Sequence, residues 1–138
     1  MPAPAPSPAM LSGLAATAHV ALGGAAGAVL RYQAGLAVTR IAGAGGLYWG
    51  TLAVNVAGSL AMGLLAGWLV RSGGNEPMRL LLGVGLLGGF TTFSAFSLEL
   101  VALIERGAFT LAVGYALLSL VAGIAGLYIG LVAMRGTP

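Results

Sequence analysis

The chain has 138 residues, of which 59% are hydrophobic and only 7% are charged, and its mean hydropathy is +1.01. An ordinary soluble domain has about 25% charged residues, so this composition excludes a soluble globule and predicts a small multi-pass membrane protein. The lack of cysteine excludes a disulfide scaffold, and the scattering of the six arginines excludes a basic nucleic-acid-binding face.

The chain begins with a stretch in which proline and alanine alternate. Proline lacks an amide hydrogen and interrupts helices, so we expect residues 1–13 to form an extended, disordered tail. A secretory signal needs a positively charged start, and none is expected here because the first arginine is residue 31. Residues 14–138 are predicted to form a single domain.

Four apolar segments make up that domain. They cover residues 14–38, 48–70, 80–103 and 108–134, and each exceeds the roughly 20 residues that a helix needs to cross the hydrocarbon core. The bilayer interior offers no water to backbone amides, so the segments must be helices. The predicted fold class is therefore an all-α membrane protein with four transmembrane helices.

Glycines recur at helical spacing within these segments. Each segment contains a pair four residues apart, namely Gly23 and Gly27, Gly63 and Gly67, Gly85 and Gly89, and Gly126 and Gly130. Helices in lipid associate where small residues let their backbones approach. The pairs predict a tightly packed bundle in which some glycine faces also join subunits.

The arginines divide almost evenly between the two ends of such a bundle. One end would hold Arg71, Arg79 and Arg135, and the other Arg40 and Arg106, with Arg31 inside the first segment. The positive-inside rule needs an imbalance, so either other signals fix the orientation or the chain inserts both ways. The second alternative predicts an antiparallel, dual-topology homodimer.

The third segment contains the densest polar patch, GGFTTFSAFS at residues 88–97. Two glycines followed by hydroxylic residues disfavour a helix interior, so we expect this helix to break near the bilayer midplane. A break frees backbone carbonyls, which suit a hard cation, and amides, which suit an anion. In an antiparallel dimer, equivalent residues meet on the two-fold axis at the midplane, where two chains could share one cation.

Further polar residues lie inside the segments, where their cost indicates function. Arg31, Asn55 and Glu99 fall at similar depth in one half of the bilayer. Arg31 and Glu99 either pair, which would only lock two helices together, or line a wet vestibule. The sequence has no nucleophile–base pattern, phosphate loop or metal-ligand cluster, so catalysis is not expected.

Two pairs of side chains share helix faces near mid-membrane. Phe93 and Phe96 are either core packing or, because ring edges carry partial positive charge, contacts for a small anion. Tyr115 and Ser119 are four residues apart. Their hydroxyls either satisfy each other or a neighbouring helix, or form a donor track along a pore.

Three motifs resemble those of the Fluc/CrcB family of fluoride channels. They are GGAAGAVLRY at residues 23–32, WGTLAVNVAGS at 49–59 and GGFTTFSAFSLE at 88–99. The resemblance covers nearly everything from Gly23 to the last segment. One departure is Ala95, where the family usually has threonine.

The resemblance implies a passive, electrogenic channel that exports fluoride from the cell and protects it from fluoride toxicity, in the inner membrane of a bacterium. It also implies an antiparallel homodimer with two pores. A structural Na⁺ would lie on the two-fold axis, held by the backbone carbonyls of Gly88 and Thr91.

By the same resemblance, Phe93 and Phe96 offer ring edges to fluoride and Asn55 donates from its amide. Tyr115 and Ser119 correspond to the hydroxyl track of the family. The alternative function is a small dual-topology multidrug or cation–proton exporter, which needs an acidic residue deep in the membrane and facing a shared cavity.

Overall fold

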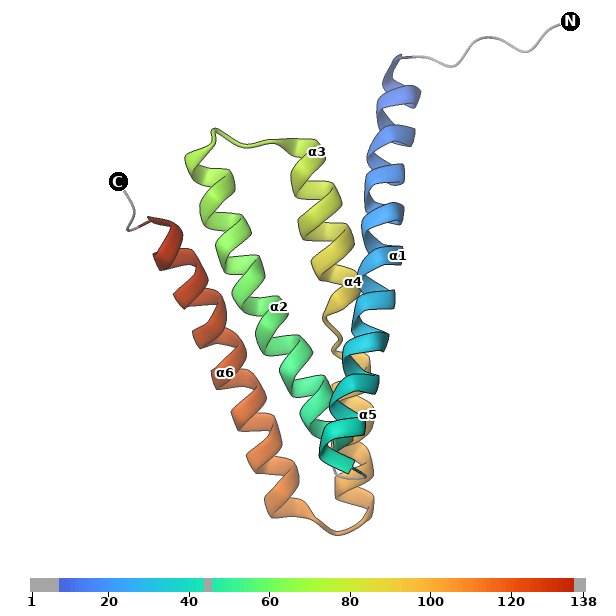
Figure 1. Cartoon of the computed structure of the whole chain (residues 1–138), viewed down its shortest axis with the longest axis vertical. Coiled ribbons are helices and arrows are strands. Elements are labelled where there is room, and N and C mark those ends of the chain that lie inside the picture. Colours follow the sequence, from blue (N-terminus) through green and yellow to red (C-terminus); the bar gives the residue numbers. More distant parts are fainter. Residues whose placement is uncertain (1–7, 44–45, 136–138) are drawn as a thin grey trace, which may run out of the picture.

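The computed structural model describes residues 8–43 and 46–135. Its elements are all helical (Figure 1): α1 (Pro8–Ala42), α2 (Gly46–Arg71), α3 (Glu76–Met78), η2 (Arg79–Leu87), α4 (Gly88–Phe90), α5 (Ser94–Glu105) and α6 (Phe109–Arg135). Four stretches are long and apolar enough to cross a membrane, namely Ser12–Ala42, Tyr48–Arg71, Glu76–Glu105 and Phe109–Arg135. The prediction of four helices of spanning length is confirmed. We call the stretch from α3 to α5 the third arm.

The first helix starts earlier than the sequence led us to expect. α1 begins at Pro8, so the tail expected over residues 1–13 is wrong for residues 8–13, while residues 1–7 lie outside the described part of the chain. Proline is favoured at the first position of a helix, because the amide hydrogen that it lacks would have no helical partner there.

The glycine pairs bring helices into close contact. A Cβ atom on Gly23 or Gly27 of α1 would collide with the backbone of η2 or α4, and one on Gly85 would lie 2.8 Å from the carbonyl oxygen of Val20. In the same way, Gly63 of α2 and Gly130 of α6 face backbone atoms of each other's helix. Figure 1 shows the two resulting pairs, α1 with η2 and α2 with α6. The predicted close packing is confirmed within one chain.

The third arm contains a π-helix that the sequence did not indicate. η2 has nine residues in this form, which usually occurs as a single wide turn. Helical geometry continues through Gly88 and Gly89 into α4. These two glycines do not interrupt the helix. Gly89 instead allows close packing against α1, since a Cβ there would lie 2.6 Å from the carbonyl oxygen of Gly24.

The two ends of the bundle differ in which chain segments they hold. The start of α1, the α2–α3 connection at residues 72–75 and the end of α6 lie at one end, and the α5–α6 connection lies at the other (Figure 1). Gly73 and Gly107 make these connections tight with φ angles of 78° and 73°, a region that glycine enters without strain. The arginines at helix ends are therefore divided between the two ends as expected.

Candidate functional site

The third arm loses helical geometry for three residues between α4 and α5. Thr91 has an extended backbone, with φ −80° and ψ 159°, and α5 begins at Ser94. The amide of Thr91 still donates to the carbonyl of Leu87 at 3.0 Å, and the next backbone bond runs from the amide of Ser97 to the carbonyl of Phe93 at 2.9 Å. The N–H and C=O groups between these two bonds need other partners.

Two carbonyl groups beside this interruption have none. The oxygens of Gly88 and Thr91 accept no hydrogen bond from any described residue, whereas Nε of Arg31 donates to the carbonyl of Gly89 at 3.1 Å. Free carbonyl oxygens are ligands that hard cations prefer. The oxygen ligands present at these two residues therefore fit the Na⁺ that the family resemblance implies there.

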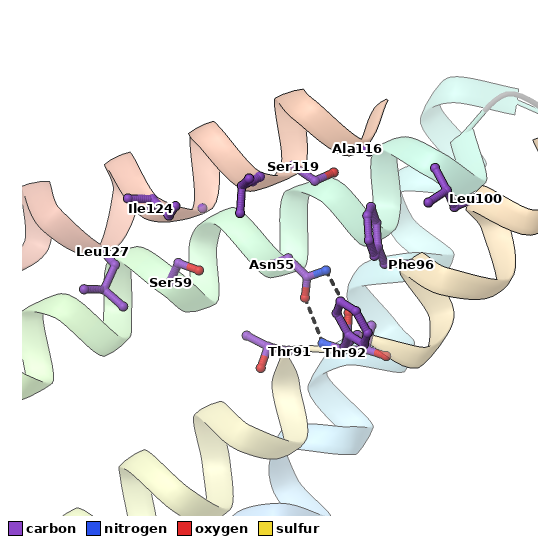
Figure 2. A pocket seen from close by; sticks show the side chains of 13 residues that line it. Asn55, Ser59, Thr91, Thr92, Phe96, Leu100, Ala116, Ser119, Ile124 and Leu127 are labelled. Carbon is purple, nitrogen blue, oxygen red and sulfur yellow. Dashed lines mark hydrogen bonds between the residues drawn. The ribbon is translucent and has the colours of Figure 1, made fainter. Parts of the chain in front are cut away.

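Asn55 of α2 bonds both backbone groups of Thr92. Its Nδ2 donates to the carbonyl of Thr92 at 2.9 Å, and its Oδ1 accepts from the amide of Thr92 at 2.8 Å (Figure 2). The hydroxyl of Thr92 in turn accepts from the amide of Ala95 at 3.2 Å, in the first turn of α5. A side chain of α2 thus replaces the helical bonds that the third arm lacks.

A cavity of about 630 Å³ opens beside the interruption, between α2, α6 and the third arm (Figure 2). Its lining is mostly apolar and contains no charged side chain. The polar and aromatic residues that line it are Asn55, Ser59, Thr91, Thr92, Phe93, Phe96 and Ser119. Four of the five residues that we proposed for an anion pore are therefore brought together.

The two phenylalanines lie side by side at this cavity. Their ring centroids are 5.8 Å apart with planes tilted by 44°. Phe96 also packs against the ring of Tyr115 at 5.3 Å, whereas Phe93 is 79% exposed. Core packing thus accounts for Phe96 in part, but it does not account for Phe93 within one chain.

The hydroxyl of Tyr115 donates to Glu99, whereas the side chain of Ser119 lies at the cavity. Tyr115 is buried and does not line the cavity, and its hydroxyl donates to Oε2 of Glu99 at 2.6 Å. The Oγ atom of Ser119 is buried and hydrogen-bonds to no described residue. Ser119 therefore presents at the cavity a hydroxyl that hydrogen-bonds to no described residue.

Glu99 is bonded to hydroxyl groups, and the first of our two alternatives, in which it pairs with Arg31, is not the one found. Besides Tyr115, its carboxyl group accepts from Oγ1 of Thr51 at 2.6 Å, and the residue is only 6% exposed. Arg31 instead bonds the backbone of Gly89. Glu99 thus joins three helices, α2, α5 and α6, through two short hydrogen bonds.

A second, smaller cavity of about 260 Å³ lies next to Arg31. It is also lined by Thr39, Thr51 and Thr92. Thr92 lines both cavities and therefore lies between them. Arg31 thus lines a small cavity, as in the second alternative that we considered for it, but Glu99 does not line this cavity.

Sequence reasoning did not single out Thr51, or the role of Thr92. Thr51 lies four residues before Asn55 and so shares its helix face, which is a signal that spacing alone provides. Thr92 is within the polar patch, but its hydrogen bonds to Asn55 are made by its backbone. No pattern of side chains in the sequence predicts such bonds.

Comparison with known proteins adds independent findings. Residues 18–131 match the family described as CrcB-like protein, Camphor Resistance (CrcB). The chain is 61% identical over 124 residues to a protein named fluoride-specific ion channel FluC from Novosphingobium aromaticivorans, which is 89% of this chain and 98% of that protein. Proteins of the same name from Erythrobacter litoralis and Phenylobacterium zucineum are 51% identical over 127 residues and 52% identical over 118 residues. These matches cover 88% and 84% of this chain, and 93% and 92% of those proteins.

Proposed function

The chain belongs to the CrcB family, and from this membership we propose that it is a passive, fluoride-selective ion channel. Its four spans make it a multi-pass membrane protein, and its family is one of channels rather than enzymes. The observation that carries the proposal is the cavity beside the interruption, because its lining combines neutral polar side chains and two phenylalanine rings with an absence of charged side chains.

This lining suits the chemistry of fluoride. The ion is small and strongly hydrated, so its passage requires several close donors in place of water. Ser119 offers a hydroxyl without a partner, Asn55 has a second Nδ2 hydrogen beyond the one given to Thr92, and Phe93 and Phe96 offer ring edges. None of these groups carries a full charge, so none would bind the ion so tightly that it could not move on.

The direction of transport follows from the membrane potential. Hydrogen fluoride crosses a bilayer as a neutral acid and dissociates inside, whereas the fluoride ion cannot leave through lipid. A negative interior potential drives the anion outward by about 2.3 kcal/mol per 100 mV. The channel would thus export fluoride electrogenically, across the inner membrane of a bacterium, and protect the cell from fluoride toxicity.

We further propose an antiparallel homodimer with two pores. The near-even division of arginines between the two ends supports insertion in both orientations. The partnerless carbonyls of Gly88 and Thr91 support a Na⁺ site on the two-fold axis, where the ion would supply the charge that holds the two interruptions together. Glycine faces left open by one chain would complete the contact.

The exporter alternative lacks its key residue. Such a pump needs an acidic side chain facing a cavity, but Glu99 lines neither of the two cavities and is bonded to Thr51 and Tyr115. The deciding experiment is ion efflux from liposomes that contain the purified protein, with Na⁺ present. Fast, electrogenic efflux of fluoride but not chloride is expected, and no fluoride efflux would contradict the proposal.

A further inference from the structure

One face of α2 follows the third arm across its interruption. Thr51, Asn55 and Gly58 lie on this face, at positions i, i+4 and i+7. In that order they contact Glu99 of α5, then Thr92 and finally Thr91. Gly58 is required at the last point because a Cβ there would collide with the side chain of Thr91. The contacts therefore begin in α5, on one side of the interruption, and end at Thr91, the first residue of the interruption.

The middle contact replaces helical hydrogen bonds. In a continuous helix the amide of Thr92 would donate to the carbonyl of Gly88, which instead has no partner here. A carboxamide is chemically equivalent to a peptide group, so Asn55 satisfies the donor and the acceptor of Thr92 at once. Among side chains only asparagine and glutamine combine an N–H donor with a carbonyl acceptor in this way.

We propose that Asn55 is a positioning residue, which keeps residues 91–93 non-helical and thereby fixes the ring of Phe93 and the free carbonyls of Gly88 and Thr91. Lipid penalises unpaired backbone groups, so without this carboxamide the segment relaxes to another conformation. The consequence for permeation rests on the proposed function, whereas the effect on the backbone does not. The second Nδ2 hydrogen stays available at the cavity, so positioning and anion contact are compatible.

The test compares three variants of the full channel in lipid, with ¹³C-labelled threonine and phenylalanine. Asn55→Ala removes both bonds, and the Cα chemical shifts of Thr91, Thr92 and Phe93 are expected to change. Ser59→Ala is the matched control, because Ser59 lines the same cavity from the next turn of α2 and makes no hydrogen bond to the interruption. In this control the three shifts are expected to match wild type.

The third variant, Asn55→Asp, makes the effect reversible. A protonated carboxyl group retains one donor and one acceptor, whereas the ionised form cannot donate. The wild-type shifts are therefore expected at acidic pH and are lost as the pH rises. Wild type is measured at each pH to correct for Glu99 and Arg31, the ionisable residues that bond near this site.

Three results would overturn the inference. These are unchanged shifts at residues 91–93 in Asn55→Ala, an Asn55→Asp spectrum that does not change with pH, or changes of equal size at Phe109 and Thr110, the labelled residues of α6. Loss of fluoride efflux with unchanged shifts would leave Asn55 as an anion donor alone. If wild type conducts no fluoride but the shifts move as expected, the proposed function fails and the positioning role stands.

Discussion

Glu99 shows how a single acidic residue is kept inside a membrane protein. Burying a carboxyl group is costly unless its oxygens are paired, and each oxygen here accepts one hydroxyl hydrogen, from Thr51 or from Tyr115. The arrangement explains why Glu99 does not need Arg31 as a partner. It also makes the two hydroxyl donors important for stability.

Removing either donor is expected to destabilise the fold. Thr51→Val and Tyr115→Phe each delete one hydrogen bond between transmembrane helices, at a cost of about 1–2 kcal/mol. The measurement is the unfolding free energy in detergent or lipid. Tyr48→Phe is the control, because Tyr48 packs edge-on against Tyr115 but its hydroxyl hydrogen-bonds to no described residue. Equal stability losses in all three variants would contradict this role of Glu99.

Phe93 offers a test of the ring-edge contact that does not disturb the core. Because its ring is 79% exposed in one chain, Phe93→Ile is expected to leave folding intact. A lost ring contact of about 1 kcal/mol slows flux by about fivefold, measured as fluoride efflux from liposomes. Leu98→Ile is the control, since Leu98 is exposed on α5 and lines neither cavity. Unchanged efflux in Phe93→Ile would argue against the ring-edge role.

At the scale of the elements, the sequence predicted the features that depend on residue spacing within one segment. It did not predict the hydrogen bonds between segments. The four helices and their glycine contacts were predictable, because length, apolarity and the four-residue interval belong to each segment alone. The bond between Asn55 and Thr92 joins residues 37 positions apart, and its formation depends on how α2 and the third arm align. The π-helix η2 packs against α1, and no local sequence pattern indicated its form.

The contact between α2 and α6 makes a prediction about glycine at the element scale. In Gly63→Ala, the added Cβ would collide with the carbonyl oxygen of Leu127 and lie 2.9 Å from the amide nitrogen of Leu131, both backbone atoms that cannot rotate away. Overpacking of this kind costs about 1–3 kcal/mol, and thermal unfolding in detergent would measure it.

The matched control for this prediction lies in α6 itself. Gly114→Ala adds the same methyl group at a position where no atom lies within 4 Å, so stability should stay the same or rise through better helix propensity. A loss of stability in Gly114→Ala as large as that in Gly63→Ala would show that the close approach of α2 and α6 is not the cause.

At the scale of the whole molecule, the distribution of the arginines and the unpaired backbone carbonyls both bear on how two copies of the chain could associate. The arginines are divided between both ends of the bundle, so the positive-inside rule has little imbalance on which to act. In two opposed copies, the membrane midplane is the depth at which the carbonyls of Gly88 and Thr91 could meet across a two-fold axis. The proposed Na⁺ site and the proposed antiparallel dimer are therefore compatible with each other.

Dual topology predicts that each end of the bundle is found on both faces of the membrane. The natural chain has no cysteine, so single cysteines report without background. Ser72→Cys and Thr110→Cys place one at each end, on exposed residues and without changing charge, and they avoid Gly73 and Gly107, whose positive φ angles would strain a side chain. A membrane-impermeant maleimide is expected to label about half of each variant from outside, and the remainder after the membrane is opened. Labelling of Ser72→Cys from one face and of Thr110→Cys only from the other would establish a single orientation, and the antiparallel dimer would have to be abandoned.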